Sequence, residues 1–391
     1  MRHSNFLRIF FLLLFCVAFA CPAYSETIRL KSGKTIEGKI IEKTDKHIKV
    51  DIGGITVTYY ADQILTGSPL PEADNTKNKQ NKKRIKYEIT EKFYLQGIAD
   101  THFLKFCMVV PRNDMPGQTL SNIEIFPKPN STFIDVDGNE IAVYHSSLLK
   151  AGDKLIIGFK YIFEREITPP DIKPESISDA YSFNEDSMKK YLSAEGEINP
   201  KEPSIEAKAA SLTDGITNPY KKAKEIYNFI TNNFRYDYAL LQRFQADSYA
   251  YRSYSPQDTL ARHKGICYDF AKLFVALARS SGLPARVVRG FAFDFSEDKD
   301  CYVENYGHAW AEFYLPDYGW VAVDPTYGLL KKDKFFCFTY SSHIPQEYGL
   351  SEVKDFGSLE KGWHLQFRSQ TKPTRPPVEV KIEAKLVKSV N

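Results

Sequence analysis

Alternation of apolar and polar residues, typical of strands, fills the chain up to about residue 167, and helical spacing replaces it after Pro169 and Pro170. Before these prolines, short alternating runs are separated by turn residues such as Asp137-Gly138-Asn139. After them, apolar residues recur on one face of a helix, at Ala223, Ile226, Ile230 and Phe234. A run of strands followed by a run of helices predicts an α+β protein.

Two β units are predicted before the helices. Residues 26–67 contain four short alternating runs, with Gly53-Gly54 as the best signal of a tight hairpin turn. In its spacing, this small unit resembles the SH3-like barrels of bacterial envelope proteins. Residues 85–168 contain several more runs and are predicted to form an antiparallel β-sandwich. We expect the sandwich to be a scaffold, because no reactive side chains cluster in its sequence.

Residues 68–84 lie between these units and are predicted to be a flexible linker. The stretch has no large apolar residue after Leu70 and is rich in Asn, Gln and Lys. Its end is basic, with positive charges at Lys77, Lys79, Lys82, Lys83 and Arg84. Two interpretations stay open. A solvated tether is the commoner role of such runs, and a contact with an anionic envelope surface is the other.

The first 25 residues have the pattern of a secretory signal. Basic residues precede an apolar run at residues 9–20 that is short for a membrane span. Cleavage after Ser25 gives a mature chain that begins at Glu26 and is exported to the periplasm or the wider envelope. A lipoprotein signal at residues 18–21, with Cys21 as the lipidated residue, is a weaker alternative, and a retained anchor is a third.

Composition and charge narrow the function. Of the 391 residues, 43% are hydrophobic and 26% charged, which is typical of a folded globular protein. The formal net charge of +3 falls to +1 without Arg2 and Arg8 of the signal. A balance so close to zero gives no broad basic surface, so nucleic acid is not predicted as a partner.

Gly265-Ile266-Cys267 stands directly before an apolar helical pattern. The pattern includes Phe270, Phe274, Leu277 and Ala278, and Gly282 with Pro284 ends it. The free N–H groups at a helix start favour a thiolate and can also bind an oxyanion, so Cys267 is a candidate nucleophile. Gly265 is expected to let the backbone turn sharply before the sulfur.

His308 and Asp324 lie on two predicted strands joined by the turn Pro316-Asp317-Tyr318. If Leu315 pairs with Gly319, the register places His308 diagonally opposite Asp324, and the two side chains can meet. A carboxylate next to an imidazole fixes its tautomer and stabilises its charged form, as a base that serves a thiol requires. Cys267, His308 and Asp324 therefore form a predicted nucleophile, base and orienting group.

Around these residues the sequence resembles the transglutaminase-like superfamily of papain-type cysteine enzymes. Three blocks carry the resemblance, within about residues 205–330: Gly265-Ile266-Cys267 with its helix and Gly282-Leu283-Pro284-Ala285-Arg286, Gly307-His308-Ala309-Trp310, and Gly319-Trp320-Val321-Ala322-Val323-Asp324-Pro325. The resemblance implies a papain-like catalytic domain at residues 169–345, followed by a C-terminal β extension at residues 346–391. It also implies that a thioester forms on Cys267, that His308 shuttles the proton, and that Asp324 orients His308.

The family resemblance further implies a donor for the oxyanion upstream of the cysteine. Tyr236 is the candidate, because it follows the predicted helix that ends near Phe234. Tyr238, Tyr249 and Tyr251 compete for this role, and a packing role for Tyr236 is the alternative.

The predicted activity is thiol-dependent cleavage or transfer at an amide bond of an envelope peptide or protein, with hydrolysis preferred over crosslinking because amine transfer requires a site that excludes water. The alternative is a non-catalytic module that binds a peptide or glycan. No cofactor is implied: the sequence has no EF-hand loop for calcium, and the cysteine spacing forms no zinc signature. Pairing among Cys107, Cys301 and Cys337 stays open.

Overall fold

In the computed structural model the chain divides into two compact units, residues 1–73 and 74–391. The structure describes residues 26–29, 35–43, 47–51, 56–60, 83–115, 117–167, 172–179, 181, 188–246, 253–292, 300–304, 307–338, 343–350, 365–368 and 378–388. The predicted signal, the lipidation alternative at Cys21 and most of the predicted linker lie outside these residues. Among the described residues, no helix is long and apolar enough to cross a membrane.

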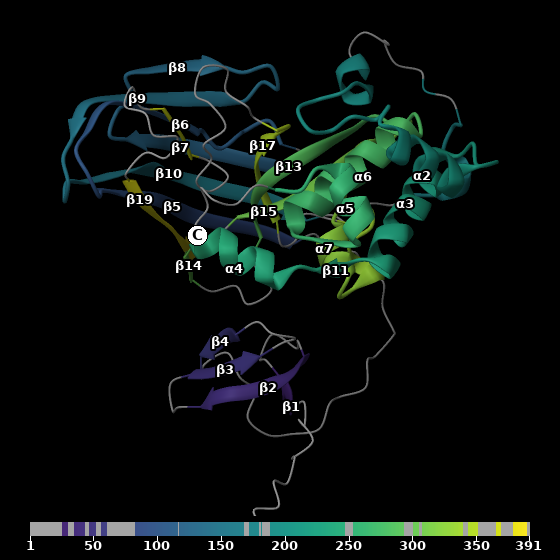
Figure 1. Ribbon diagram of the computed structural model, residues 1–391, viewed down its shortest axis with the longest axis horizontal. Helices are drawn as coiled ribbons and strands as arrows, with labels where there is room; N and C mark the ends of the chain where they lie inside the picture. Colours follow the sequence, from purple (N-terminus) through teal and green to yellow (C-terminus); the bar gives the residue numbers. More distant parts are fainter. Residues whose placement is uncertain are drawn as a thin grey trace, which may run out of the picture. The chain divides into compact units, whose positions relative to one another are not determined.

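Four antiparallel strands form the first unit, in the sheet order β1-β2-β3-β4 (Figure 1). They are β1 (Glu26–Arg29), β2 (Thr35–Lys43), β3 (His47–Asp51) and β4 (Thr56–Tyr60). Asp51 pairs with Thr56, the register expected for a hairpin around Gly53-Gly54. The turn itself lies outside the described residues.

Two antiparallel sheets form the β-rich part of the second unit and share one hydrophobic core. Their strand orders are β14-β19-β5-β10-β7 and β18-β6-β9-β8. Phe93 and Phe159 of the first sheet belong to the same core as Phe106 and Tyr144 of the second. The strands are β5 (Lys83–Gly97), β6 (Thr101–Val109), β7 (Gln118–Phe126), β8 (Ser131–Ile134), β9 (Glu140–Leu149), β10 (Lys154–Ile167), β14 (Cys301–Glu304), β18 (Leu365–Arg368) and β19 (Val378–Lys388).

Strands from the end of the chain complete these sheets. β19 pairs with β5 along its whole length, and β18 pairs with β6. The residues predicted as a C-terminal extension are therefore joined to the first β-rich segment. β5 begins at Lys83, so residues 83 and 84, predicted as the end of the linker, belong to this strand. Glu91 is buried within β5, and its carboxylate accepts a hydrogen bond of 2.6 Å from the Tyr161 hydroxyl.

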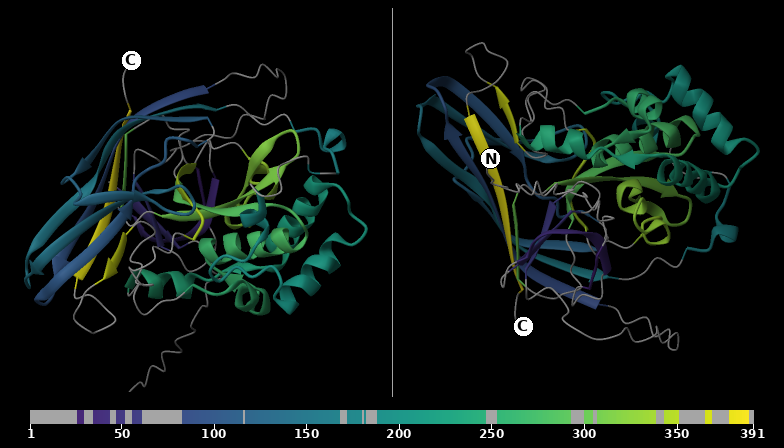
Figure 2. Two further views of the ribbon diagram at one scale, coloured as in Figure 1. Left: turned by 90° about the horizontal axis from the view of Figure 1, so that it is seen from above. Right: turned by 60° about the horizontal axis from the view of Figure 1, so that its bottom comes forward.

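The other half of the second unit packs helices against a four-stranded sheet, β16-β15-β13-β17 (Figure 2). The helix α6 (Cys267–Ser280) lies at its centre, with residues 267–279 all buried. The other helices are α2 (Pro203–Thr213), α3 (Pro219–Asn233), α4 (Tyr238–Ala246), α5 (Pro256–Arg262) and α7 (Pro325–Gly328). The strands are β13 (Ala285–Ala292), β15 (His308–Leu315), β16 (Gly319–Val323) and β17 (His343–Tyr348). α3 is capped by Asn218, whose side chain accepts the backbone N–H of Lys221 at 3.1 Å.

β17 joins the two halves of this unit. It pairs with β13, and it also receives side chains of the β-rich half. Gln346 Nε2 donates to Glu91 Oε1 at 2.6 Å, Gln118 Nε2 donates to the carbonyl of Pro345 at 3.3 Å, and Arg165 donates to the carbonyl of His343. The position of β17 is therefore set from both halves.

Candidate active site

Cys267 is the first residue of α6 and is 5% exposed. The helix start is fixed by Asp269, whose Oδ2 accepts the backbone N–H of Ile266 at 3.0 Å and whose Oδ1 accepts that of Tyr254 at 2.9 Å. The sulfur is thus attached at a helix N-terminus, where the peptide dipoles favour a negative charge. The predicted placement of this cysteine at a helix start is confirmed.

Gly265 is needed for a different reason from the one predicted. Its φ does not lie in the left-handed region, so the backbone does not require glycine conformationally. Instead, a Cβ at this position would lie 2.8 Å from the Cβ of Asp269, too close for any real contact. Gly265 is therefore required because the carboxylate that caps α6 packs directly against it.

Tyr236 lies beside Cys267. It belongs to β11 (Arg235–Tyr236), which pairs in parallel with β12 (Lys264–Gly265), two residues before the cysteine. The Tyr236 hydroxyl lies close enough to Cys267 for both the backbone N–H and the side chain of Cys267 to influence its pKa. Burial and the nearby sulfur raise the pKa of Tyr236 well above its usual range, so the phenol is neutral and can donate.

The competing tyrosines fall into two groups. Tyr238 packs its ring against Tyr236, with the ring centroids 5.0 Å apart. Tyr249 and Tyr251 lie outside the described residues. Of the two described candidates, Tyr236 and Tyr238, it is Tyr236 whose hydroxyl is influenced by the sulfur and the backbone N–H of Cys267.

His308 and Asp324 meet as the hairpin register predicts. Leu315 pairs with Gly319, and the pairing continues to Ala311 opposite Val323. His308 Nε2 lies 2.7 Å from Asp324 Oδ2, and both side chains are almost completely buried. Asp324 is also the N-cap of α7: its Oδ1 accepts the backbone N–H groups of Thr326 and Tyr327 at 2.8 and 3.0 Å.

The ring of His308 lies between the carboxylate and the sulfur. Burial lowers the pKa of His308, but the charge and hydrogen bond of Asp324 and a hydrogen bond with Cys267 outweigh it and raise this pKa above its ordinary value. Because Nε2 is engaged by Asp324, Nδ1 is the ring nitrogen available to Cys267. The Asp324 carboxylate therefore favours the protonated, positively charged form of His308. A positively charged His308 is the partner that a Cys267 thiolate needs.

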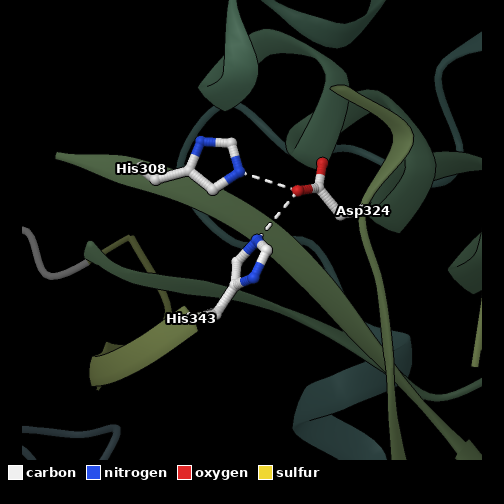
Figure 3. A group of neighbouring side chains, drawn as sticks. All are labelled: His308, Asp324 and His343. Atoms are coloured by element: carbon white, nitrogen blue, oxygen red, sulfur yellow. Dashed lines mark hydrogen bonds and ion pairs between the residues drawn. The ribbon is translucent and has the colours of Figure 1, made fainter. Parts of the chain in front are cut away.

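A second imidazole, that of His343, contacts the same carboxylate oxygen (Figure 3). His343 Nε2 lies 3.0 Å from Asp324 Oδ2, and the side chain is completely buried. Burial, stronger than the opposing influence of Asp324, lowers the pKa of His343 to about 4. His343 is therefore neutral at pH 7 and donates its Nε2 hydrogen to Asp324.

Sequence reasoning missed His343, and no local pattern marks it. It opens a strand that contains Pro345, which argues against a central sheet position, and it stands 19 residues after Asp324. Only the pairing of β17 with β13, across about 50 residues of chain, brings it to the site.

His308, Asp324 and His343 form the only group of three or more His, Cys, Asp or Glu side chains close enough to hold a metal ion in the described part of the chain. Their N···O distances of 2.7 and 3.0 Å are those of hydrogen bonds. Ligands around tetrahedral zinc lie about 3.3 Å apart, given zinc–nitrogen bonds of ~2.0 Å. A cation here would replace both hydrogen bonds, so the geometry fits a hydrogen-bonded array better than a metal centre.

The cysteines are separate from one another. None of Cys107, Cys267 and Cys337 takes part in a disulfide. Cys107 lies in the β-rich half, and Cys337 packs against the core around α6. The side chain of Cys301 lies outside the described residues, and neither of its two candidate partners, Cys107 and Cys337, is in a disulfide.

Comparison with known proteins adds to this geometry. The sequence model of the Transglutaminase-like superfamily matches residues 206–325, which include Tyr236, Cys267, His308 and Asp324. The chain carries a transglutaminase-like domain. His343 lies beyond the matched residues.

Relatives match only parts of the chain. The Bacillus subtilis protein YebA is 25% identical over 195 residues, which are 48% of this chain and 23% of that protein. A protein-glutamine gamma-glutamyltransferase of Pseudomonas aeruginosa is 35% identical over 100 residues, 23% of this chain and 15% of that enzyme. The chain thus spans less than a quarter of either relative's length.

A solved structure supports the fold over a longer span. The crystal structure of a candidate cysteine protease from Cytophaga hutchinsonii superposes with a TM-score of 0.52 at 17% identity, over 77% of this chain and 90% of that one. A likeness at this identity concerns the fold alone. It extends well beyond residues 206–325, so it includes more than the transglutaminase-like domain.

Proposed function

We propose that this protein is a thiol-dependent hydrolase or acyl transferase that acts on amide bonds of peptides or proteins, with Cys267 as nucleophile, His308 as base and acid, and Asp324 as the group that orients His308. The observation that carries the proposal is the position of the His308 ring, whose Nε2 lies 2.7 Å from Asp324 Oδ2 and which is close enough to Cys267 for the sulfur to raise its pKa. The same three residue types in this arrangement serve nucleophilic catalysis on other folds.

In the proposed mechanism, the Cys267 thiolate attacks the amide carbonyl carbon, and a C–S bond forms while the carbonyl oxygen becomes negative. The backbone N–H of Cys267 and the nearby Tyr236 hydroxyl are the donors proposed for that oxygen. When the adduct collapses, the C–N bond breaks and the amine leaves with the proton of the His308 imidazolium.

The thioester is then resolved. Neutral His308 takes a proton from a water molecule while the oxygen of that water attacks the thioester carbon. The C–S bond breaks, the carboxylic acid leaves, and the Cys267 thiolate and His308 imidazolium are restored. An amine in place of water would give a transferred acyl group and a new amide bond.

Hydrolysis is our preferred outcome, because transfer requires a site that admits the amine and excludes water. Crosslinking is the second candidate, favoured by the relative named a protein-glutamine gamma-glutamyltransferase. A non-catalytic peptide- or glycan-binding module is the alternative from another class. The presence of all three reactive side chains in hydrogen-bonding order argues against it.

We also propose that the protein acts in the periplasm or on the envelope, because the first 25 residues have the pattern of an export signal. In this proposal the two sheets around β5 and β6 are a β-sandwich, the strands β1–β4 are an SH3-like unit, and envelope peptides or proteins are the substrates. The basic run at residues 77–84 is proposed as a tether, with contact to an anionic surface as the alternative.

The decisive experiment compares Cys267→Ala with wild type on a generic protein substrate, with and without a labelled primary amine. Cys337→Ala is the matched control, because this cysteine is also outside any disulfide and packs against the same core, but it is not among the groups that shift the pKa of His308. We expect Cys267→Ala to lower the rate by a factor on the order of 10⁶ and to unfold at nearly the wild-type temperature. Cys337→Ala should keep the wild-type rate.

The products separate the candidates. Release of new amino groups indicates hydrolysis, and incorporation of the labelled amine indicates transfer. Retained turnover in Cys267→Ala, or slow alkylation of Cys267 in the wild type at neutral pH, would reject the mechanism and leave the binding module.

A further inference from the structure

Asp324 is the most densely hydrogen-bonded side chain of the site. Its Oδ1 accepts the backbone N–H groups of Thr326 and Tyr327, and its Oδ2 accepts both His308 and His343. Two donors on each oxygen fill all the directions in which a carboxylate accepts hydrogen bonds. The carboxylate can then rotate only by breaking several bonds at once.

We propose that His343 is a positioning residue that keeps the Asp324 carboxylate ionised and aimed at His308. This inference rests on the proposed function, since it concerns the same site. His343 is not one of the residues proposed above to touch the substrate. It acts through Asp324, to which it donates a hydrogen bond of 3.0 Å.

The need for such a donor follows from burial. Asp324 is completely buried, and burial alone raises the pKa of a carboxyl and favours its neutral form. The charge of His308 and the hydrogen bonds from His308 and His343 outweigh burial and bring the pKa of Asp324 well below its usual range. A neutral Asp324 would not stabilise the His308 imidazolium, so the donor serves the thiolate–imidazolium pair.

His343 must stay neutral to do this without repelling His308. Among the described residues, the charged groups that influence its pKa are Asp324, His308 and Arg165. Asp324 favours a charged His343, whereas His308, Arg165 and burial oppose it, and the opposition prevails. Neutral His343 thus offers Asp324 a hydrogen bond without adding a second positive charge beside His308.

The orientation of His343 is fixed by its surroundings. Its ring packs among aromatic rings with centroids between 4.7 and 6.0 Å away, those of Trp310, Tyr327, Phe335 and Phe338. Its backbone carbonyl accepts a hydrogen bond from Arg165 of β10. The β-rich half therefore helps to hold the imidazole toward Asp324.

The test measures the rate at which iodoacetamide alkylates Cys267 in the full chain as a function of pH, so that no substrate is needed.

Two variants are compared with the wild type. His343→Phe keeps an aromatic ring but removes the hydrogen-bond donor, and His343→Gln keeps an N–H group at a similar distance from Asp324. We expect His343→Phe to slow alkylation at pH 7 about tenfold or more, the usual effect of one hydrogen bond to a charge. The acid limb of the curve of alkylation rate against pH should move to higher pH. Without the donor, Asp324 is protonated more easily, and a neutral Asp324 no longer stabilises the His308 imidazolium that favours the thiolate. His343→Gln should recover most of the rate.

A double-mutant cycle separates positioning from general damage. In an Asp324→Asn background, His343→Phe should have little further effect, because both changes act through one carboxylate. Thermal melts monitor folding, and His343→Met is the donor-free replacement if the Phe variant does not fold. The inference is overturned if the donor-free variant keeps the wild-type profile, if His343→Gln is equally slow, or if the two effects are additive.

The same alkylation experiment gives a different result if the proposed function itself is wrong. In that case wild-type Cys267 itself is alkylated no faster than Cys337 at pH 7. A fast, pH-dependent wild type with an unchanged donor-free variant would reject only the role of His343.

Discussion

The nucleophile side of the site and its carboxylate side are built in different ways. Tyr236, Gly265, Cys267 and Asp269 lie within 34 residues of chain and are held by α6 and the short pairing of β11 with β12. Asp324 and His343 depend instead on the sheet β16-β15-β13-β17, and the end of β17 is held by Arg165 of the β-rich half. One side is local, and the other is assembled from distant parts.

The nucleophile side and the carboxylate side of the site depend on different hydrophobic cores. The local side draws on contacts within one hydrophobic core, that around α6. The carboxylate side also includes β17, whose Ile344 belongs to the core between the two β-rich sheets. The β-rich half, expected from the sequence to be a scaffold, therefore reaches the site through one strand.

The largest effect in this comparison is expected for Asp324→Asn, on the carboxylate side. The rate should fall by a factor on the order of 10⁴, because the base loses its orientation and its stabilising charge. The folded-state pKa of His308 is raised by Asp324, so without that charge the imidazolium loses its proton at lower pH. The alkaline limb of the pH–rate profile should move downward, and an unchanged limb would contradict the role of Asp324.

Tyr236→Phe, on the nucleophile side, should have the next largest effect. The substitution keeps the ring and removes the hydroxyl that lies at the backbone N–H of Cys267. Loss of one oxyanion donor lowers kcat by about 10²-fold and leaves KM nearly unchanged. Tyr238→Phe is the matched control on the adjacent ring, and an equal loss in both variants would mean that Tyr236 only packs.

Arg165→Leu tests whether the carboxylate side depends on the β-rich half. It removes the donor to the carbonyl of His343 and a hydrogen bond to Gln118, both buried. We expect a loss of ~1–3 kcal/mol in the free energy of unfolding and a rate about tenfold lower. Arg84→Leu, whose side chain is 75% exposed in its ion pair with Glu164, should change that free energy by less than about 0.5 kcal/mol. Urea unfolding of both variants gives the comparison, and equal losses would refute it.

Removal of residues 26–80 should have the smallest effect. This part of the chain belongs to a separate compact unit, apart from its last few residues, and the cut ends before β5 begins at Lys83. The rate should stay within about twofold and the remaining unit should melt as before, since independent domains fold alone. Loss of soluble protein on this truncation would show that the front unit is needed for folding.

Local signals predicted much of the site. The helix start at Cys267 follows from an apolar pattern bounded by glycines, and the contact of His308 with Asp324 follows from the length of one turn. Both depend on neighbours within about 20 residues. The reason for Gly265 was wrong, because packing against Asp269, and not a special φ, excludes a side chain there.

Non-local contacts account for what the sequence did not reveal. His343 reaches Asp324 only through the pairing of β17 with β13, and β19 reaches β5 only from the far end of the chain. The burial of Glu91 has no local signal either, because the hydroxyl that donates to it, that of Tyr161, lies 70 residues away. Pattern and spacing carry no information on such partners.

The pairing of β19 with β5 also constrains the order of events when the chain folds. Leu386 lies opposite Ile89, so the two paired segments are about 300 residues apart in the sequence. Until residues 378–388 have been made, one edge of β5 has unpaired backbone groups, the kind of edge that recruits other strands. A molecule that lacks residues 378–388 would keep this edge of β5 unpaired, and we expect it to aggregate through that edge.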